Sequence, residues 1–504
     1  YGHPNNTHYS EIFCPQYPAP DDLLNYSKSN ARLPNIESEY AHIMGNSLGN
    51  FKDYWDVIEN NQKLQGGFIW EWIDQSIDTI KNGRRIKAYG GDFPLEGPVD
   101  ENLSDNNFCV KGVVTAYREL TPMALEVKQV YQNFKTGLVD EHTLKLKNGY
   151  FFRNLDNYEI RWALQENGVA KEKGSLGSIS LQPQAETMLT IPYTTKLNPN
   201  KEYQLNVYFL LKSDEPFLPK GFELGSAQFL LQSLPAKQDI KIDRGKINFK
   251  ETVNEYILSG KSYKIVFDKK NAFLHQYILN ADTVLQQGPV PAFYRAPTDN
   301  DIGAGFNTKL RIWRNAYEQG TEASASFFKI NDGEYKIIFT KKLVNGNASH
   351  KQVFKVYAGG NIKVENEFTA INGAYPLLLR AGTDLVLNKS FSNIKWYGRG
   401  PGENYCDRKT ASFIGNYKKT VDEQYYPYAR PQESGNKTEV RWVNFSNNKG
   451  KKIIFQYADS LLGFSALPYN LDDLDPEARK RQYHSGELNK RNEIYVHIDL
   501  QQTG

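Results

Sequence analysis

An unusually polar segment lies between residues 35 and 47 and reads Asn35-Ile36-Glu37-Ser38-Glu39-Tyr40-Ala41-His42-Ile43-Met44-Gly45-Asn46-Ser47. Glu37 and Glu39 are two positions apart, so a strand here would place both carboxylates on one face. Carboxylates at the C-terminal end of a strand that feeds a helix are where barrel enzymes carry their chemistry. The run is so polar, however, that periodicity alone favours a solvated edge strand.

Helical and strand periods alternate on both sides of this segment. The apolar spacing predicts a helix over residues 51–58 with Asn50 as its N-cap, and the next apolar run predicts a strand over 67–73. Thr121 as N-cap and Pro122 at the first helical position predict a further helix. The alternation indicates a parallel α/β unit, but only about three strand candidates precede residue 135, too few to close an eight-stranded barrel.

Strand patterns dominate the rest of the chain. Between residues 136 and 233, period-two runs are separated by turn signals such as Asn167-Gly168, which is typical of an immunoglobulin-like sandwich. Leu234 to Asp239 has the composition of a linker. From about residue 240 to the end, the same patterns favour one large antiparallel β domain.

Composition excludes several classes of protein. The 504 residues carry a net charge of +3, are 39% hydrophobic and 24% charged, and contain no apolar run near the ~18 residues of a membrane span. No basic run could follow a nucleic-acid backbone, so nucleic-acid binding is not expected. Three cysteines, Cys14, Cys109 and Cys406, provide neither a disulfide framework nor zinc-type spacing. Aromatic residues make up 13% of the chain, which suits both β-sandwiches and sugar sites.

Several ordered motifs resemble those of the bacterial β-galactosidases of glycoside hydrolase family 2. The first is the run from Glu39 to Ser47 quoted above. The others follow in family order at family spacing: Gly66–Ser76 (GGFIWEWIDQS), Tyr89–Phe93 (YGGDF), Asn107–Val114 (NFCVKGVV), Arg295–Gly303 (RAPTDNDIG), Gly398–Tyr405 (GRGPGENY) and Pro431–Asn436 (PQESGN). Together they are far more specific than any one motif.

The resemblance implies a multidomain fold, α/β followed by all-β. Residues 1–134 would be the last strands of a (β/α)8 catalytic barrel, 135–233 an immunoglobulin-like β-sandwich, and 240–504 a large β-supersandwich of the β-galactosidase small-chain type, like that of galactose mutarotases. It also implies a retaining mechanism with two carboxyl groups about 5 to 5.5 Å apart, one the nucleophile and one the acid/base.

The motif match implies a role for five positions. Glu39 corresponds to the nucleophile, and Tyr17 to a tyrosine whose hydroxyl orients it and favours its ionised form. His42 corresponds to a substrate-binding histidine and Trp70 to the floor beneath the galactose ring. Phe108 corresponds to a residue whose backbone carbonyl ligates a monovalent cation. Ordinary barrel packing is the alternative for Tyr17, His42 and Trp70.

Three positions depart from the family pattern. Glu37 stands where the family has an apolar residue, and we interpret it as an ion-pair or strand residue. Lys111 replaces a sodium-ligating Asn, so its ammonium group is expected to bind in the pocket for the sugar O6 and to take the place of Na. Gln16 replaces a Met on the leaving-group side.

The resemblance places the acid/base Glu and the ligands of a catalytic Mg before Tyr1, and a Gly-rich segment after Gly504. The chain is therefore expected to carry the nucleophile without the acid/base, to be inactive alone, and to come from a β-galactoside-binding homo-oligomer. Another β-glycosidase specificity of the family and a non-catalytic carbohydrate-binding protein are the alternatives. Cytoplasm and periplasm are both compatible with unpaired cysteines.

Overall fold

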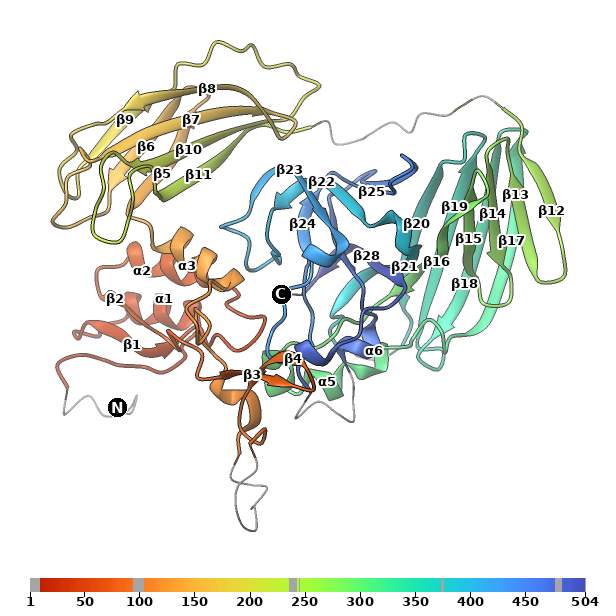
Figure 1. The fold of residues 1–504 in the computed structure, drawn as a ribbon, viewed down its shortest axis with the longest axis horizontal. Helices are drawn as coiled ribbons and strands as arrows, with labels where there is room; N and C mark the ends of the chain where they lie inside the picture. The colour runs from red at the N-terminus through yellow and green to blue at the C-terminus, as the bar shows by residue number, and fades with distance from the viewer. Residues whose placement is uncertain are drawn as a thin grey trace.

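The computed structural model describes residues 10–93, 104–234, 243, 245–372, 376–475 and 483–503, and its regular structure is mostly β (Figure 1). Most of the linker expected from Leu234 to Asp239 lies outside the described residues. Among the described residues, no helix is long and apolar enough to cross a membrane. The three cysteines are free, as expected from their spacing.

Residues 10–132 form an α/β region around a parallel strand pair. The strands are β1 (Asn35–Tyr40) and β2 (Leu64–Ile69), and the helices are α1 (Pro20–Lys28), α2 (Phe51–Glu59) and α3 (Pro122–Tyr131). Parallel bridges join Phe13 to Asn35, Gln16 to Glu39 and Ile73 to Val114, which extends the parallel arrangement on both sides.

The expected helices are confirmed and one strand is shifted. The Thr121 hydroxyl accepts a hydrogen bond from Ala124 N at 3.1 Å, and Pro122 is the first residue of α3. The strand predicted over 67–73 instead ends at Ile69. The hairpin of β3 (Ile77–Lys81) and β4 (Arg84–Ala88) was not expected from the sequence, because this mostly polar pair lacks apolar alternation.

Residues 134–232 form two antiparallel sheets that share one hydrophobic core. The first, in the order β5-β6-β9, contains β5 (Phe134–Asp140), β6 (Thr143–Asn148) and β9 (Glu186–Thr190). The second, in the order β11-β10-β7-β8, contains β7 (Tyr158–Glu166), β8 (Val169–Gly177), β10 (Tyr203–Leu211) and β11 (Glu223–Gln232). The turn signal Asn167-Gly168 is confirmed: both residues have positive φ and connect β7 to β8.

Residues 245–503, here called the β domain, contain three antiparallel sheets around one extended hydrophobic core. The nine-stranded sheet contains β12 (Asn248–Glu251), β13 (Glu255–Ser259), β14 (Tyr263–Asp268), β15 (Phe273–Leu279), β16 (Asp282–Ala292), β21 (Arg380–Asn388), β28 (Glu493–Gln502), β27 (Leu462–Leu467) and β24 (Lys437–Val440), in that order. One four-stranded sheet contains β17 (Thr321–Asn331), β18 (Glu334–Leu343), β19 (Ala348–Tyr357) and β20 (Ile362–Ala370). The other contains β23 (Phe413–Thr420), β22 (Asn393–Gly400), β25 (Trp442–Ser446) and β26 (Lys452–Gln456).

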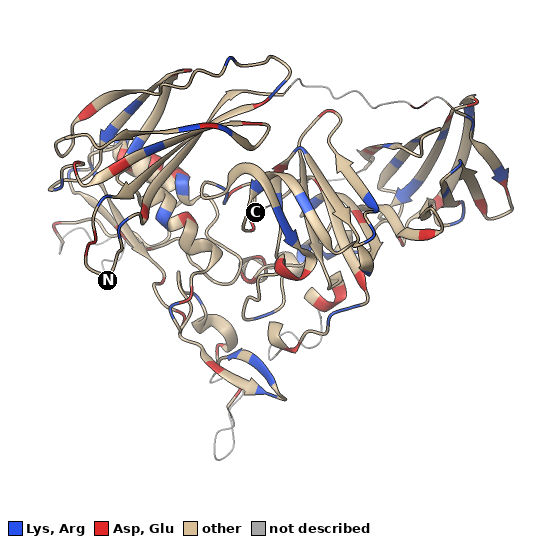
Figure 2. Cartoon of the chain, turned by 45° about the horizontal axis from the view of Figure 1, so that its top comes forward, with Lys and Arg blue, Asp and Glu red and all other residues tan. Residues whose placement is uncertain are grey.

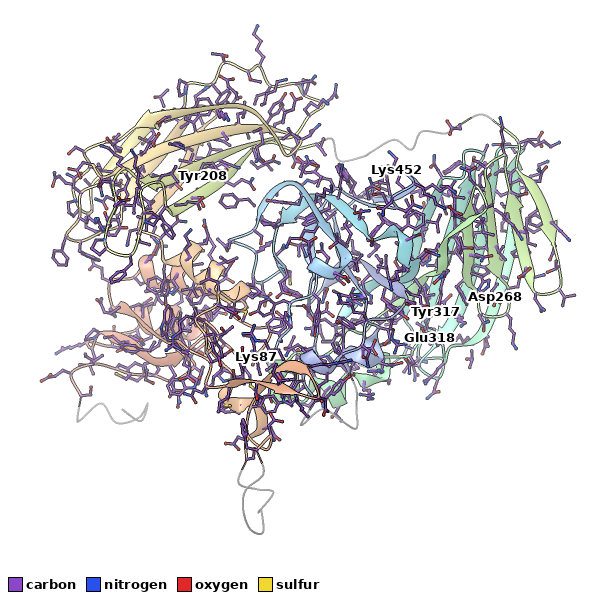
Figure 3. The ribbon with its side chains drawn as sticks, viewed as in Figure 1. Lys87, Tyr208, Asp268, Tyr317, Glu318 and Lys452 are labelled. Atoms are coloured by element: carbon purple, nitrogen blue, oxygen red, sulfur yellow. The ribbon has the colours of Figure 1, made fainter. Side chains whose placement is uncertain are left out.

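Short helices of the β domain, α4 (Asp299–Gly303), α5 (Phe306–Lys309) and α6 (Leu471–Leu474), lie on the side where the β3–β4 hairpin projects (Figure 1). Lys87 of β4 lies at this boundary (Figure 3), with its Nζ 5.8 Å from the centre of the Tyr426 ring. The α/β region and the β domain therefore contact each other at this boundary.

Candidate active site

Glu39 is the penultimate residue of β1, and its side chain is buried. Gln16 Nε2 donates a hydrogen bond of 2.9 Å to Glu39 Oε2. Gln16 is held beside Glu39 by a parallel bridge, so the amide is placed by the backbone of the neighbouring segment. A hydrogen bond to a carboxylate favours its ionised form. Sequence reasoning noted Gln16 only as a departure from the family and missed this contact.

Glu37 and Glu39 do not share a face, so the expectation from parity is wrong. The register of β1 against β2 shifts between Glu37 and Tyr40, which indicates a bulge. A side chain added at Gly67 would meet both Glu37 Cβ and the Tyr40 ring, so these two residues lie on the same side of the strand. Glu37 is fully buried there, among the aromatic residues that pack α2 against β1.

Of the two interpretations offered for Glu37, the strand residue is confirmed, since Glu37 lies in β1, and the ion pair is not found among the described residues. Neither carboxylate oxygen has a hydrogen-bond partner in that part of the chain, and no ion pair is formed. Burial raises its pKa to about 8, because an apolar environment penalises the charged form. Glu37 is therefore mostly protonated at neutral pH.

Tyr17, His42 and Phe108 lie together beside Glu39. The backbone N of Tyr17 donates to Glu39 O at 2.9 Å, and the Tyr17 ring meets the His42 ring edge-on at 6.2 Å between centres. The rings of His42 and Phe108 are 5.4 Å apart. Burial lowers the pKa of His42, so its neutral form is favoured. The expected bond from the Tyr17 hydroxyl to Glu39 stays a prediction.

Lys111 is buried between Trp70 and Phe108. Its Nζ is 5.9 Å from the centre of the Trp70 ring and 5.5 Å from that of Phe108, within the range of cation–π contact. It also forms an ion pair of 3.2 Å with Glu71 Oε1. Sequence reasoning missed Glu71, although it directly follows Trp70 in the quoted motif.

Residues of the β domain complete the surroundings of this group. Asn300 Oδ1 lies 3.5 Å from His42 Nδ1. Asn107, which precedes Phe108, donates from Nδ2 to Asp299 Oδ1 at 3.0 Å. Both contacts bridge more than 190 positions of sequence. Asn107, Asp299 and Asn300 all lie in the quoted motifs, but the motifs do not indicate that these residues meet.

No set of three or more His, Cys, Asp or Glu side chains in the described part of the chain is arranged to hold a metal ion. Basic and acidic residues are interspersed over all regions of the fold (Figure 2).

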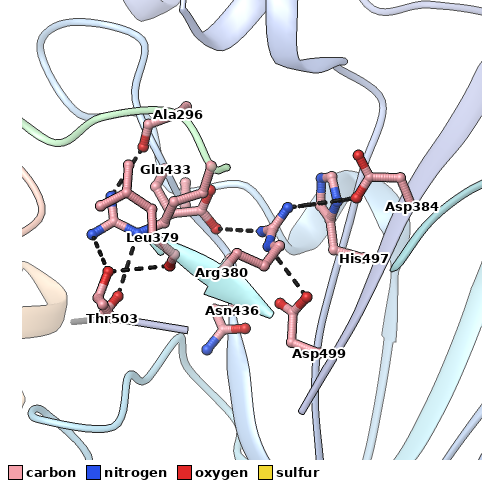
Figure 4. Close-up of polar contacts among 12 residues, drawn as sticks. Ala296, Leu379, Arg380, Asp384, Glu433, Asn436, His497, Asp499 and Thr503 are labelled. Carbon is pink, nitrogen blue, oxygen red and sulfur yellow. Dashed lines mark hydrogen bonds and ion pairs between the residues drawn. The ribbon is translucent and has the colours of Figure 1, made fainter. Parts of the chain in front are cut away.

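A second buried polar cluster lies in the β domain, on β21 and β28 (Figure 4). Arg380 is 2.9 Å from His497 Nδ1, 3.2 Å from Asp499 Oδ1 and 3.8 Å from Glu433 Oε1. His497 in turn contacts Asp384 at 2.5 Å. Burial raises the pKa of Asp499 to about 6, and the Arg380 charge opposes this increase. None of the residues that β21 and β28 contribute to this cluster was singled out from the sequence.

Comparisons with known proteins agree with the motifs. Residues 259–504 match the family described as Beta galactosidase small chain, 6–136 match the TIM barrel domain of glycosyl hydrolases family 2, and 144–232 match β-galactosidase domain 4. A β-galactosidase of Priestia megaterium is 31% identical over 501 residues, which cover 98% of this chain and 47% of that protein. One from Pseudoalteromonas haloplanktis is 29% identical over 537 residues, covering 99% of this chain and 50% of that protein.

A solved exo-chitosanase from Amycolatopsis orientalis aligns with 69% of this chain and 29% of its own, with 11% identity and a TM-score of 0.20, and no conclusion rests on this likeness. The family matches and the relatives together cover nearly the whole sequence. The chain belongs to glycosyl hydrolase family 2. It spans about half the length of the curated relatives it matches.

Proposed function

We propose that the protein carrying this chain is a retaining exo-β-galactosidase, which hydrolyses terminal β-D-galactosyl residues through a glycosyl-enzyme intermediate. The observation that supports it most is the group of Glu39, His42, Trp70, Phe108 and Lys111 around one strand end. A carboxylate, a neutral imidazole, an ammonium and exposed ring faces are the groups that recognise a sugar and attack it. The relatives named β-galactosidase support galactose as the sugar.

In this proposal Glu39 attacks the anomeric carbon and the bond to the leaving oxygen breaks. Gln16 donates a hydrogen bond to one carboxylate oxygen of Glu39, which favours the ionised form that attacks. Tyr17 orients the nucleophile, while His42 and Trp70 bind the ring. The acid/base, which protonates the leaving oxygen and then activates water, belongs to a part of the protein outside these 504 residues, so we propose that the isolated chain is inactive.

The resemblance also implies Na near Phe108 and a catalytic Mg. The described residues around Phe108 do not fit sodium, because the Lys111 ammonium already brings a positive charge there and is paired with Glu71. We propose that Lys111 takes the place of the ion and donates to the sugar O6. Any Mg ligands belong outside this chain.

The finer fold assignment is part of the same proposal. The parallel strands of residues 10–132 are compatible with the end of a (β/α)8 barrel, and the two sheets of 134–232 with an immunoglobulin-like sandwich. The three sheets of the β domain are compatible with a galactose-mutarotase-like supersandwich.

A panel of nitrophenyl β-glycosides tests the activity on the full-length protein. We expect hydrolysis of the β-galactoside in preference to the β-glucuronide and the β-mannoside. Glu39→Gln should lower kcat by at least about 10³-fold, because the nucleophile is lost. Glu37→Gln is the matched control on the same strand and should retain activity. Preference for another glycoside, or equal loss in both variants, would contradict the proposal.

A further inference from the structure

Hydrogen bonds from the β domain hold the loop Gly45–Asn50, which follows the nucleophile strand, while Leu48 of the loop packs in the core of the α/β region. Asn46 N donates to Gln432 Oε1 at 3.0 Å, and Asn46 Nδ2 donates to the carbonyl of Glu433 at 3.0 Å. Arg408 Nη2 donates to Asn46 Oδ1 at 2.6 Å. The loop therefore has little freedom of its own, and its position depends on residues about 360 to 390 positions away.

Asp299 is the residue on which these contacts converge. Its Oδ1 accepts hydrogen bonds from Asn107 Nδ2 and Arg430 Nε, both at 3.0 Å, and its Oδ2 accepts one from Gln432 Nε2 at 2.8 Å. Its carboxylate also lies against the Gly45 backbone, where a Cβ would come within 2.4 Å of Oδ2. Gly45 has a positive φ, so both the conformation and the space at this position require glycine.

The chemistry of this contact requires a carboxylate. Three side-chain donors, from Asn107, Arg430 and Gln432, meet at one buried group, and an ionised carboxylate is an acceptor at every lone pair. An amide of the same shape would direct N–H groups at partners that also donate. At least one buried donor would then lose its acceptor, which is costly in the protein interior.

The two segments joined by Asp299 carry two walls of the proposed sugar site. His42 precedes the Gly45–Asn50 loop by three residues, and Phe108 directly follows Asn107. The His42 and Phe108 rings are 5.4 Å apart, so a change in the separation of the segments alters the space between the rings. Glu39, by contrast, is fixed by β1 and by Gln16.

We propose that Asp299 is a positioning residue that sets the separation of His42 and Phe108 from the β domain. The inference rests on the proposed function for its effect on catalysis, but not for its effect on structure. Because Glu39 is held independently, loss of Asp299 affects substrate binding more than the chemical step.

Asp299→Asn in the full-length protein tests this. We expect the KM for a nitrophenyl β-galactoside to rise at least about 10-fold while kcat changes by less than about 3-fold, the pattern of lost uniform binding. A merely structural role would reduce the active fraction, which lowers kcat and leaves KM unchanged. Hydrogen exchange should accelerate in peptides covering 42–50 and 105–110.

Asp301→Asn is the matched control. Asp301 is also buried and acidic, and it pairs with Arg295 at 2.5 Å, but its described contacts reach neither segment. It should lower the Tm without changing KM or the exchange of the two peptides. If Asp299→Asn does not fold, Asn107→Ala removes a single donor and should raise KM with faster exchange confined to 105–110.

Unchanged KM and unchanged exchange in Asp299→Asn, or equal effects in Asp301→Asn, would overturn the inference. A wild-type protein that hydrolyses no galactoside would instead overturn the proposed function. The exchange measurement would then still decide whether Asp299 positions the two segments.

Discussion

At the residue scale, Glu37 shows how one strand separates two carboxylates into different chemical environments. Glu39 accepts a hydrogen bond from Gln16, whereas Glu37 is buried without a hydrogen-bond partner among the described residues. A bulge of one residue is enough to produce this difference, because it reverses which side of the strand each following residue faces.

Glu37 should make the protein less stable as the pH rises. Its pKa is raised to about 8 in the folded state from an ordinary value of 4.5, so the folded state holds the proton more tightly. The contribution of Glu37 to the free energy of unfolding is most favourable below about pH 4.5. It declines between pH 4.5 and 8, by about 1.4 kcal/mol per pH unit. Glu37→Gln should remove this slope. The free energy of unfolding, measured from pH 5 to 8, should exceed that of the wild type by a growing amount in Glu37→Gln as the pH rises.

Asp53→Asn on the exposed face of α2 serves as its control and should show no such trend. A constant difference between Glu37→Gln and wild type over this range would contradict the assignment of a buried, protonated Glu37.

Lys111 allows a second prediction at this scale. If its ammonium takes the place of sodium, wild-type hydrolysis should be unaffected when Na is replaced by choline at constant ionic strength. Lys111→Asn should lower activity and make the remainder depend on Na, because the amide oxygen is a cation ligand and carries no charge. Rates measured in both salts decide this, and a wild type that requires Na contradicts it.

At the scale of elements, β21 and β28 hold a buried charge cluster that depends on Arg380. Arg380→Met should lower the free energy of unfolding by about 3 to 5 kcal/mol, because Asp499 and Glu433 lose their buried countercharge. Adding Asp499→Asn should recover part of the loss, since it removes one uncompensated charge. Denaturation of both variants checks this, and additive losses would show that the two residues are not coupled.

Elements with a strong local signal could be predicted from the sequence. The capping residues of α3 and the Asn167-Gly168 turn carry their geometry in their own chemistry. The β3–β4 hairpin and the bulge in β1 could not be predicted, because their stability comes from packing against distant segments. The candidate site divides in the same way. The motifs predict Glu39, His42 and Lys111 as site residues, but the role proposed for Asp299 depends on contacts that form only when distant segments meet in the folded chain.

At the scale of the whole molecule, the β3–β4 hairpin docks the α/β region onto the β domain. His484 Nε2 is 2.8 Å from Asp92 Oδ2, and Arg84 Nη1 donates to the carbonyl of Glu487 at 2.6 Å. Gly486 lies directly against the hairpin, where a Cβ would come within 2.0 Å of the Arg85 carbonyl oxygen. This contact has no room for a side chain.

Gly486→Val should therefore separate the hairpin from the β domain. We expect a lower Tm and faster proteolysis between residues 77 and 93, because backbone atoms cannot yield as a flexible side chain would. Gly137→Val in β5 is the control, since nothing lies within 4 Å of a Cβ at that position. Equal protease resistance of both variants would show that the hairpin contact is not stabilising.

We propose above all that Glu39 is the nucleophile of a retaining β-galactosidase. The most direct measurement is to incubate the full-length protein with a 2-fluoro β-galactoside carrying a good leaving group, digest it, and locate the label by peptide mass analysis. We expect one fluorogalactosyl group on the peptide containing Glu39, and none in Glu39→Gln. A label on another carboxylate, or no label on any peptide, would contradict it.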